Sequence, residues 1–407
     1  MLHHPRKILI ISGLCLMVFI FNKCIQQQKK LPDLRGAAYA GNEKCANCHK
    51  AIYDAFLKTA HCRTSEPATA SSIKGNFAKD GNTLFYRDAL KVVMEHTDSG
   101  FYQAAYVDDS LKQSARFDIV MGSGRKGQSY LYWFNDNVFQ LPVSYYVPEK
   151  SWVNSPGFPP QNVVFNRGIP IGCFECHSSY IKKTASKPMG DYLFDFFDKS
   201  KIIYGIDCER CHGAAAQHAS FHEHDPTQKK PMFIANIATL KRQQKLDMCA
   251  MCHSGARETF LAPFNYKPGD NMREYLQDDT AGLITSNIDV HGKQYQLLIA
   301  SKCYLDNNSL TCNTCHNTHV EERNDLRDFS AKCISCHNHP NHDNVETSTE
   351  IRAGFSNNCI DCHMPARPSA VITMKAQTHL NPIPALVRTH FISIYPNATK
   401  EYLEKKK

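Results

Sequence analysis

The chain has 407 residues, of which 42% are apolar and 21% are charged. This composition indicates a globular protein and excludes an intrinsically disordered or collagen-like chain. The formal charge is +8, yet no run of Lys and Arg interleaved with aromatic residues occurs, so we expect no nucleic-acid partner. The 18 cysteines are far more than a chain of this size ordinarily carries, so the chemistry that uses their sulfur is the first question to answer.

The N-terminus carries an uncharged apolar run from Ile8 to Phe21, preceded by Arg6 and Lys7. This arrangement is typical of a secretory signal peptide, and the run is shorter than the roughly 20 residues that span a bilayer comfortably. No small-residue cleavage site follows it directly, so three interpretations stay open: a cleaved signal peptide, an uncleaved segment that tethers the protein to the inner membrane, and a lipoprotein acylated on Cys15 or Cys24. In each case the folded part is exported, and we expect a periplasmic protein.

The chain divides into four predicted segments. Residues 1–36 form the N-terminal signal or anchor and a polar tether, and residues 37–75 contain a Cys-x-x-Cys-His motif that leads into an amphipathic helix. Residues 76–165 are rich in aromatic, β-branched and turn-forming residues, which predicts a β-rich insert. Residues 166–407 contain six further copies of the motif with short segments between them. We therefore predict a mainly α, irregular fold with a β-rich insert between the first and second motifs.

The motif itself indicates the chemistry. Two cysteines three residues apart place both sulfurs on one side of a tight turn, where they can form thioethers to the two vinyl groups of one porphyrin, and the next imidazole then reaches the iron. Structural zinc and a thioredoxin-like redox pair are the rival interpretations, but neither explains a His after every pair. We therefore expect seven covalent haem c groups. The seven motifs are Cys45/Cys48/His49, Cys173/Cys176/His177, Cys208/Cys211/His212, Cys249/Cys252/His253, Cys312/Cys315/His316, Cys333/Cys336/His337 and Cys359/Cys362/His363.

The second axial ligand of each iron decides what the protein can do, because an iron with two protein ligands can only pass electrons. His319 lies three residues after His316, on the same face if the segment is helical, so it should bind a neighbouring haem. His61 would stand roughly 18 Å from His49 along a continuous helix, so it too should serve another haem. The expected distal ligands are His61, His218, His291, His319, His342 and His390, with His222 as the seventh.

Other candidate ligands are less well placed. His96, His224 and His379 are expected to be surface residues. Met251 lies inside a motif and Met364 directly follows a proximal His, so neither suits its own iron. All-His ligation, and hence low reduction potentials, is the prediction.

Several charged and sulfur-bearing residues remain outside the motifs. The propionates of seven haems would bring roughly 14 negative charges, which accounts for the basic excess. Arg125, Lys126 and Arg167 could bind an anionic substrate or, more simply, pair with propionates. Cys62 and Cys303 could form a disulfide in an oxidising compartment, or stay as two buried thiols.

Several stretches resemble a known family. Tyr39-Ala40-Gly41 before the first motif, Lys58 to His61, Cys208 to Gly213 followed by His218, Asp289 to Gly292, and Cys312 to His319 are similar to the multihaem cytochrome c-552/4 family. This family includes the tetrahaem electron acceptor of hydroxylamine oxidoreductase and is related to octahaem cytochromes. The resemblance implies a mostly helical fold with closely stacked haem pairs, and distal-ligand roles for His61, His218 and His319. Seven motifs instead of four leave the assignment of individual haems open.

Two functions follow from these observations. The first is electron transfer between redox protein partners, quinol-linked or other cytochromes, through closely spaced and mostly bis-His haems. The second is a multihaem oxidoreductase that acts on a small nitrogen or sulfur compound at one open haem, with the β-rich insert shaping the pocket. The resemblance allows catalysis, since octahaem relatives act on hydroxylamine, nitrite or tetrathionate, but the Cys-x-x-Cys-Lys variant of nitrite reductases is absent from the sequence. We favour electron transfer and assign no catalytic residue.

Overall fold

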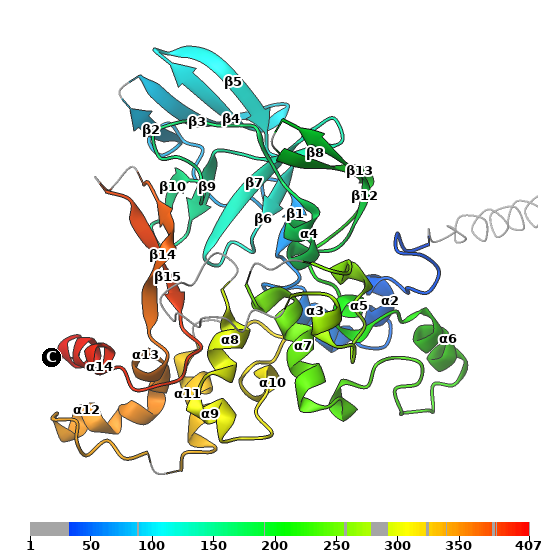
Figure 1. The fold of residues 1–407 in the computed structure, drawn as a ribbon, viewed down its shortest axis with the longest axis vertical. Helices are drawn as coiled ribbons and strands as arrows, with labels where there is room; N and C mark the ends of the chain where they lie inside the picture. Colours follow the sequence, from blue (N-terminus) through cyan, green and yellow to red (C-terminus); the bar gives the residue numbers. More distant parts are fainter. Residues whose placement is uncertain are drawn as a thin grey trace, which may run out of the picture.

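The computed structural model describes residues 32–406 except 88, 191, 256–258, 278–291, 323–324, 339, 377–378 and 380. The apolar run from Ile8 to Phe21 and the candidate ligand His291 therefore lie outside the described residues. In the view of Figure 1, the β-sheets occupy the upper part and most of the helices lie below them. No helix within the described ranges is long and apolar enough to cross a membrane.

Three antiparallel sheets make up the β part. A meander follows the order β2-β3-β4-β5, a larger sheet follows β1-β6-β7-β8-β13-β12 with β9, β10 and β11 attached to its side, and β14 pairs with β15. The meander strands are β2 (Thr83–Arg87), β3 (Leu90–Thr97), β4 (Gly100–Val107) and β5 (Ser110–Arg116). The larger sheet contains β1 (Ser65–Pro67), β6 (Ile119–Met121), β7 (Gly127–Phe134), β8 (Asn137–Gln140), β9 (Val143–Tyr146), β10 (Ser151–Asn154), β11 (Arg167–Gly168), β12 (Ser178–Met189) and β13 (Tyr192–Tyr204). The last hairpin is β14 (Ala366–Met374) and β15 (Ile383–Arg388).

The helices are short. They are α2 (Asn42–Ala46), α3 (Lys50–Phe56), α4 (Ile171–His177), α5 (Cys208–His212), α6 (Ala216–His224), α7 (Arg242–His253), α8 (Gln294–Ile299), α9 (Lys302–Leu305), α10 (Cys312–Cys315), α11 (Leu326–Ile334), α12 (Thr349–Ala353), α13 (Cys359–His363) and α14 (Pro396–Glu404). Single 3₁₀ turns occur at Ile237–Thr239, Pro263–Asn265, Met272–Glu274 and Phe355–Asn357.

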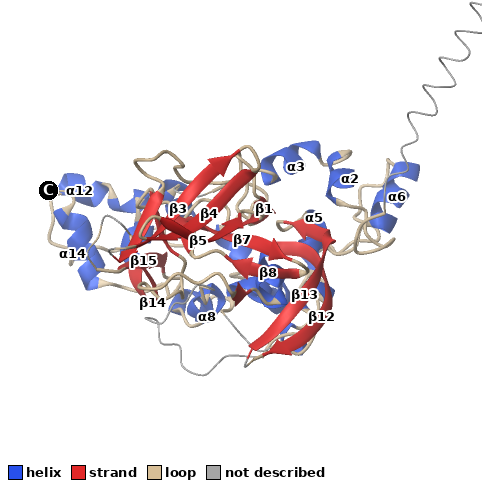
Figure 2. Ribbon diagram, turned by 90° about the horizontal axis from the view of Figure 1, so that it is seen from above, coloured by secondary structure: helices blue, strands red, loops and turns tan. Residues whose placement is uncertain are grey.

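The prediction of a mainly α fold is wrong, because the structure is about 28% helical and 29% strand. Strands β2 to β10 lie within the segment where strands were expected, but two long hairpins lie outside it. The β12–β13 hairpin directly follows the second motif, and β14–β15 follows the seventh; Figure 2 shows β12 and β13 alongside β8. The physical reason is that a Cys-x-x-Cys-His motif needs only one helical turn, which leaves the residues between motifs free to form strands.

The apolar core sits in the β part. Its largest cluster surrounds Trp152, which is 3% exposed, and includes Tyr130, Phe117 and Leu84. A second cluster packs Phe174 of α4 against the sheet. The helical part differs, since α2, α6, α10 and α12 bury no residue at all. The short helices therefore do not form a conventional helix-packed core, and their interior surfaces face the cavity described next.

Candidate functional site

One cavity of about 2380 Å³ runs through the helical part. An ordinary small-molecule pocket has a volume of roughly 300–1,000 Å³, so this cavity is more than twice as large as the upper end of that range. The seven motif histidines all line it, together with at least one cysteine of every motif. The cavity is also lined by His61, His218, His222, His319, His342 and His390, but not by His96, His224 or His379.

Each motif includes a helical turn, and the helices that carry the motifs range from the four residues of α10 to the 12 residues of α7. In the first, fifth and sixth motifs the His N–H donates to the carbonyl of the first cysteine, at 2.8, 3.0 and 2.9 Å. Side chains cap several of these turns: Asp207 accepts from the N–H of Arg210 before the third motif, and Asn358 accepts from that of Asp361 before the seventh. The turn brings both sulfurs and the imidazole of a motif close together, as covalent haem attachment requires.

Cysteines of different motifs lie in contact. The thiol pairs are Cys45 with Cys208, Cys176 with Cys252, Cys249 with Cys312, and Cys333 with Cys359. Cys211 also has Cys252 as an electrostatic neighbour, and Cys315 has Cys336. Together these pairs relate all seven motifs: the first contacts the third, the fourth contacts the second and the fifth, and the third and fourth are electrostatic neighbours. The fifth motif is next to the sixth, and the sixth contacts the seventh.

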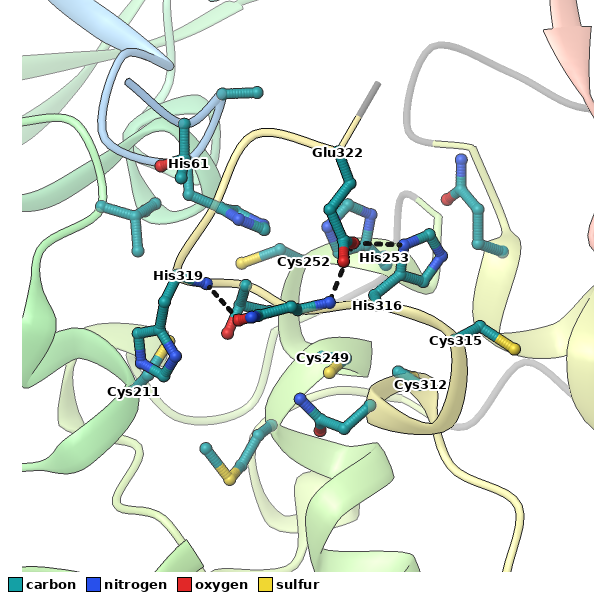
Figure 3. Close-up of a pocket in the computed structure, with 18 of the residues that line it drawn as sticks. His61, Cys211, Cys249, Cys252, His253, Cys312, Cys315, His316, His319 and Glu322 are labelled. Atoms are coloured by element: carbon teal, nitrogen blue, oxygen red, sulfur yellow. Dashed lines mark hydrogen bonds and ion pairs between the residues drawn. The ribbon is translucent and has the colours of Figure 1, made fainter. Parts of the chain in front are cut away.

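Among the described residues, four motif histidines face a second histidine from elsewhere in the chain. A metal–imidazole bond is about 2 Å long, so two imidazoles on opposite sides of one metal ion have ring centres about 6 Å apart. The observed centroid separations are 6.1 Å for His61 and His253, 5.9 Å for His212 and His319, 6.2 Å for His316 and His390, and 6.2 Å for His342 and His363. Figure 3 shows His61 and His253 entering the cavity from different chain segments.

Hydrogen bonds orient several of these rings. The Thr64 hydroxyl lies 2.8 Å from Nδ1 of His177, and Nδ1 of His363 lies 2.9 Å from the Ser393 carbonyl oxygen. Such partners hold the ring by Nδ1 and leave Nε2 for a metal ion. The carboxylate of Glu322 lies 3.7 Å from Nδ1 of His316, as Figure 3 shows. Glu322 was not a predicted site residue, because an isolated Glu carries no sequence signal for this role.

Helix α6 presents two histidines to the cavity, one turn apart. The rings of His218 and His222 are 4.6 Å apart, and Nδ1 of His218 lies 2.7 Å from the Met232 carbonyl oxygen. Burial lowers the pKa of His212, and the nearby imidazoles of His319, His49 and His218 lower it further. The first motif, the third motif and α6 therefore lie close to one another. Elsewhere, burial and the neighbouring His316 lower the pKa of His390 to about 4, so its imidazole is neutral, as a metal ligand must be.

The remaining candidates have other surroundings. Arg125 pairs with Glu321, Lys126 donates to the Leu386 carbonyl, and Arg167 donates to the Pro156 carbonyl. Cys62 and Cys303 are free thiols, and burial raises the pKa of each. Lys126 and Cys303 line the cavity, and Cys303 has Cys336 of the sixth motif as an electrostatic neighbour. His379 instead contacts Glu149.

The donor set fits haem better than zinc. A structural zinc site needs four converging ligands. Over the described ranges, no group of three or more His, Cys, Asp or Glu side chains converges in this way. Paired imidazoles at a separation of about 6 Å, next to cysteine pairs on single turns, match the needs of an iron porphyrin instead.

Comparisons with known proteins agree with this chemistry. Residues 167–213, which include the second and third motifs, match the family model of cytochrome c554 and c-prime. The fold is similar to the crystal structure of the outer cell wall cytochrome OcwA, with a TM-score of 0.53 and 16% identity over 90% of this chain and 82% of that chain. At this identity the similarity concerns the fold. No curated protein matches the chain.

Proposed function

We propose that this chain, which belongs to the multihaem c-type cytochromes, carries electrons between redox protein partners through seven covalently attached haems. Members of such families bind haem c through thioethers and use it for electron transfer. The observation that carries the proposal is the series of cysteine contacts and electrostatic neighbours that relates all seven motifs, since closely spaced haems allow electrons to pass from one to the next.

The motif contacts suggest the order of the haems. The path runs from the first motif to the third, fourth, fifth, sixth and seventh, and the second branches from the fourth. The order in space thus differs from the order in sequence. The first and seventh motifs end the main path, and the second ends the branch, so partners would exchange electrons at these positions.

The facing histidines suggest the axial ligands. We assign His61 to the iron bound by His253, and His319 to the iron bound by His212. In the two pairs at 6.2 Å, we assign His390 to the iron bound by His316, and His342 to the iron bound by His363. For the first haem we propose His49 with His218, which shares the same neighbourhood. His222 and His291 remain predicted ligands without an assigned iron. A haem iron with two imidazole ligands changes between ferric and ferrous states without binding a substrate.

Export and location are part of the proposal. The N-terminal sequence pattern and the extracytoplasmic chemistry of haem attachment both support an exported protein, periplasmic and either released or tethered by the N-terminal apolar run. The excess of basic side chains would balance the haem propionates within the fold.

The test counts haems and open irons in the purified protein. The pyridine haemochrome assay should give seven haems per chain, and carbon monoxide added after dithionite reduction should leave the Soret band unshifted. Fewer than seven haems would contradict the predicted number. A shift in about one-seventh of the Soret band would show one open iron and favour the oxidoreductase function instead.

A further inference from the structure

A buried charge cluster joins the segment before the first motif to the third motif. The Arg35 guanidinium donates to Asp33 at 2.9 and 3.0 Å, to Asp207 at 2.7 and 3.1 Å, and to Glu209 at 3.1 Å. The side chains of Arg35, Asp207 and Glu209 are 7%, 4% and 1% exposed. Arg35 also stacks on the Tyr39 ring, at 4.3 Å. Its five hydrogen bonds therefore hold one side chain in a single orientation.

Glu209 connects three separate elements. Its carboxylate accepts from the N–H groups of Ala40 and Gly41, which precede α2, at 2.9 Å each. It also accepts from the N–H of Ala215, the residue that caps α6, at 2.8 Å. Glu209 itself lies between the two cysteines of the third motif. One carboxylate thus fixes the first motif, the third motif and the helix of His218 relative to one another.

Apolar packing contributes little to this arrangement. Helix α2 buries no residue, α3 buries only Phe56, and α6 buries none. Without an apolar core of their own, these elements depend on polar contacts for their placement. The further contacts are also polar: the Ala216 N–H donates to the Ala38 carbonyl at 3.0 Å, and Lys44 pairs with Glu223.

We infer that Arg35 is a positioning residue, which acts through Glu209 to hold the first motif and α6 so that His49 and His218 address the same iron. This inference rests on the proposed function, because it assumes a six-coordinate first haem. Loss of the guanidinium would leave three neighbouring carboxylates without their shared cation, and the first motif and α6 would separate from the third motif. The haems of the second, fourth, fifth, sixth and seventh motifs, whose residues Arg35 does not contact, would keep their ligands.

The test is Arg35→Gln in the full-length haem-loaded protein. After dithionite reduction, carbon monoxide should shift about one-seventh of the Soret band, against no shift in the wild type. Hydrogen exchange measured by mass spectrometry should increase in peptides that cover residues 33–56 and 207–224, and nowhere else. Arg35→Lys keeps the charge with fewer hydrogen bonds and should give a smaller shift. The matched control is Lys50→Gln, which removes the exposed Lys50–Asp54 pair of α3 and should leave both readouts unchanged.

The outcomes separate the inference from the proposed function. An open iron in the wild type would contradict the proposed function itself. If the wild type is fully six-coordinate and Arg35→Gln remains so, with unchanged exchange, Arg35 does not position the first haem. Carbon monoxide binding spread over all haems, or failure of both Arg35 variants to fold, would make Arg35 a residue of general stability and overturn the inference.

Discussion

Gly205→Ala should open the fourth haem by displacing His61. Gly205 has a φ of +64°, and a Cβ atom added there would lie 1.8 Å from the Cys62 carbonyl oxygen. Real Cβ atoms essentially never come closer than 3.0 Å, so the segment around Cys62 must move by about 1.2 Å, the difference between the two values. The adjacent His61 is held here through its carbonyl, which accepts from the Ile206 N–H at 2.9 Å.

A shift of this size is large for a metal ligand. Metal–ligand distances are fixed to within about 0.2 Å, so a displacement of about 1.2 Å should break the bond between His61 and the iron held by His253. The left-handed backbone conformation adds roughly 1–2 kcal/mol of destabilisation for any residue with a Cβ. We expect carbon monoxide to shift about one-seventh of the Soret band in the reduced variant, and the melting temperature to fall.

Gly190→Ala provides the matched control. Gly190 has a φ of +62°, but an added Cβ there would meet nothing within 4 Å. Gly190→Ala should therefore lower the stability by a similar amount through its left-handed backbone conformation, but leave every haem six-coordinate. If Gly205→Ala gave the same carbon monoxide response as Gly190→Ala, the close approach to Cys62 would not position His61, and the assignment of His61 to the fourth haem would lose its support.

Three further predictions address the site and the fold. His319→Ala should leave seven haems in the pyridine haemochrome assay but open the iron held by His212, visible as a carbon monoxide shift in about one-seventh of the Soret band; no shift would refute the pairing. Trp152→Ala should lower the free energy of unfolding by about 3–5 kcal/mol, because the indole is buried in the β part, while the haem spectrum stays unchanged. Burial raises the pKa of Asp118 above 3.8, so the stability that depends on its protonation is lost as the pH rises through the folded-state pKa. Relative to Asp118→Asn, the wild type should therefore lose stability from acid toward neutral pH in denaturant titrations, and parallel pH profiles would contradict this.

Some features of the fold could be predicted from the sequence and others could not. The alternating aromatic and β-branched residues between the first two motifs predicted strands, and β2 to β10 lie there. The β12–β13 hairpin was not predicted, because its apolar residues do not alternate along the sequence: Asp195 and Phe197 are buried, while Phe194 and Phe196 are half-buried. This burial has a period of two, but it exists only in the folded chain.

The candidate site shows the same division. The sequence predicts that His319 binds a neighbouring haem if the segment after His316 is helical. Helix α10 ends at Cys315, so that premise does not hold, and the 5.9 Å separation between the rings of His319 and His212 supports the assignment instead. No such argument identifies Arg35 or Glu322, since a single charged residue has many ordinary surface roles. Their contacts arise only when segments far apart in the chain are brought together.

The sequence by itself determined the cofactor chemistry of this protein, because a Cys-x-x-Cys-His motif carries both thioether sulfurs and an axial imidazole within five consecutive residues. Only the tertiary structure decided which motifs are neighbours and which histidines face each other. His61 and His253, or His316 and His390, come from segments far apart in the chain and face each other across one cavity. Such long-range geometry depends on the packing of the whole chain, which no local pattern of residues encodes.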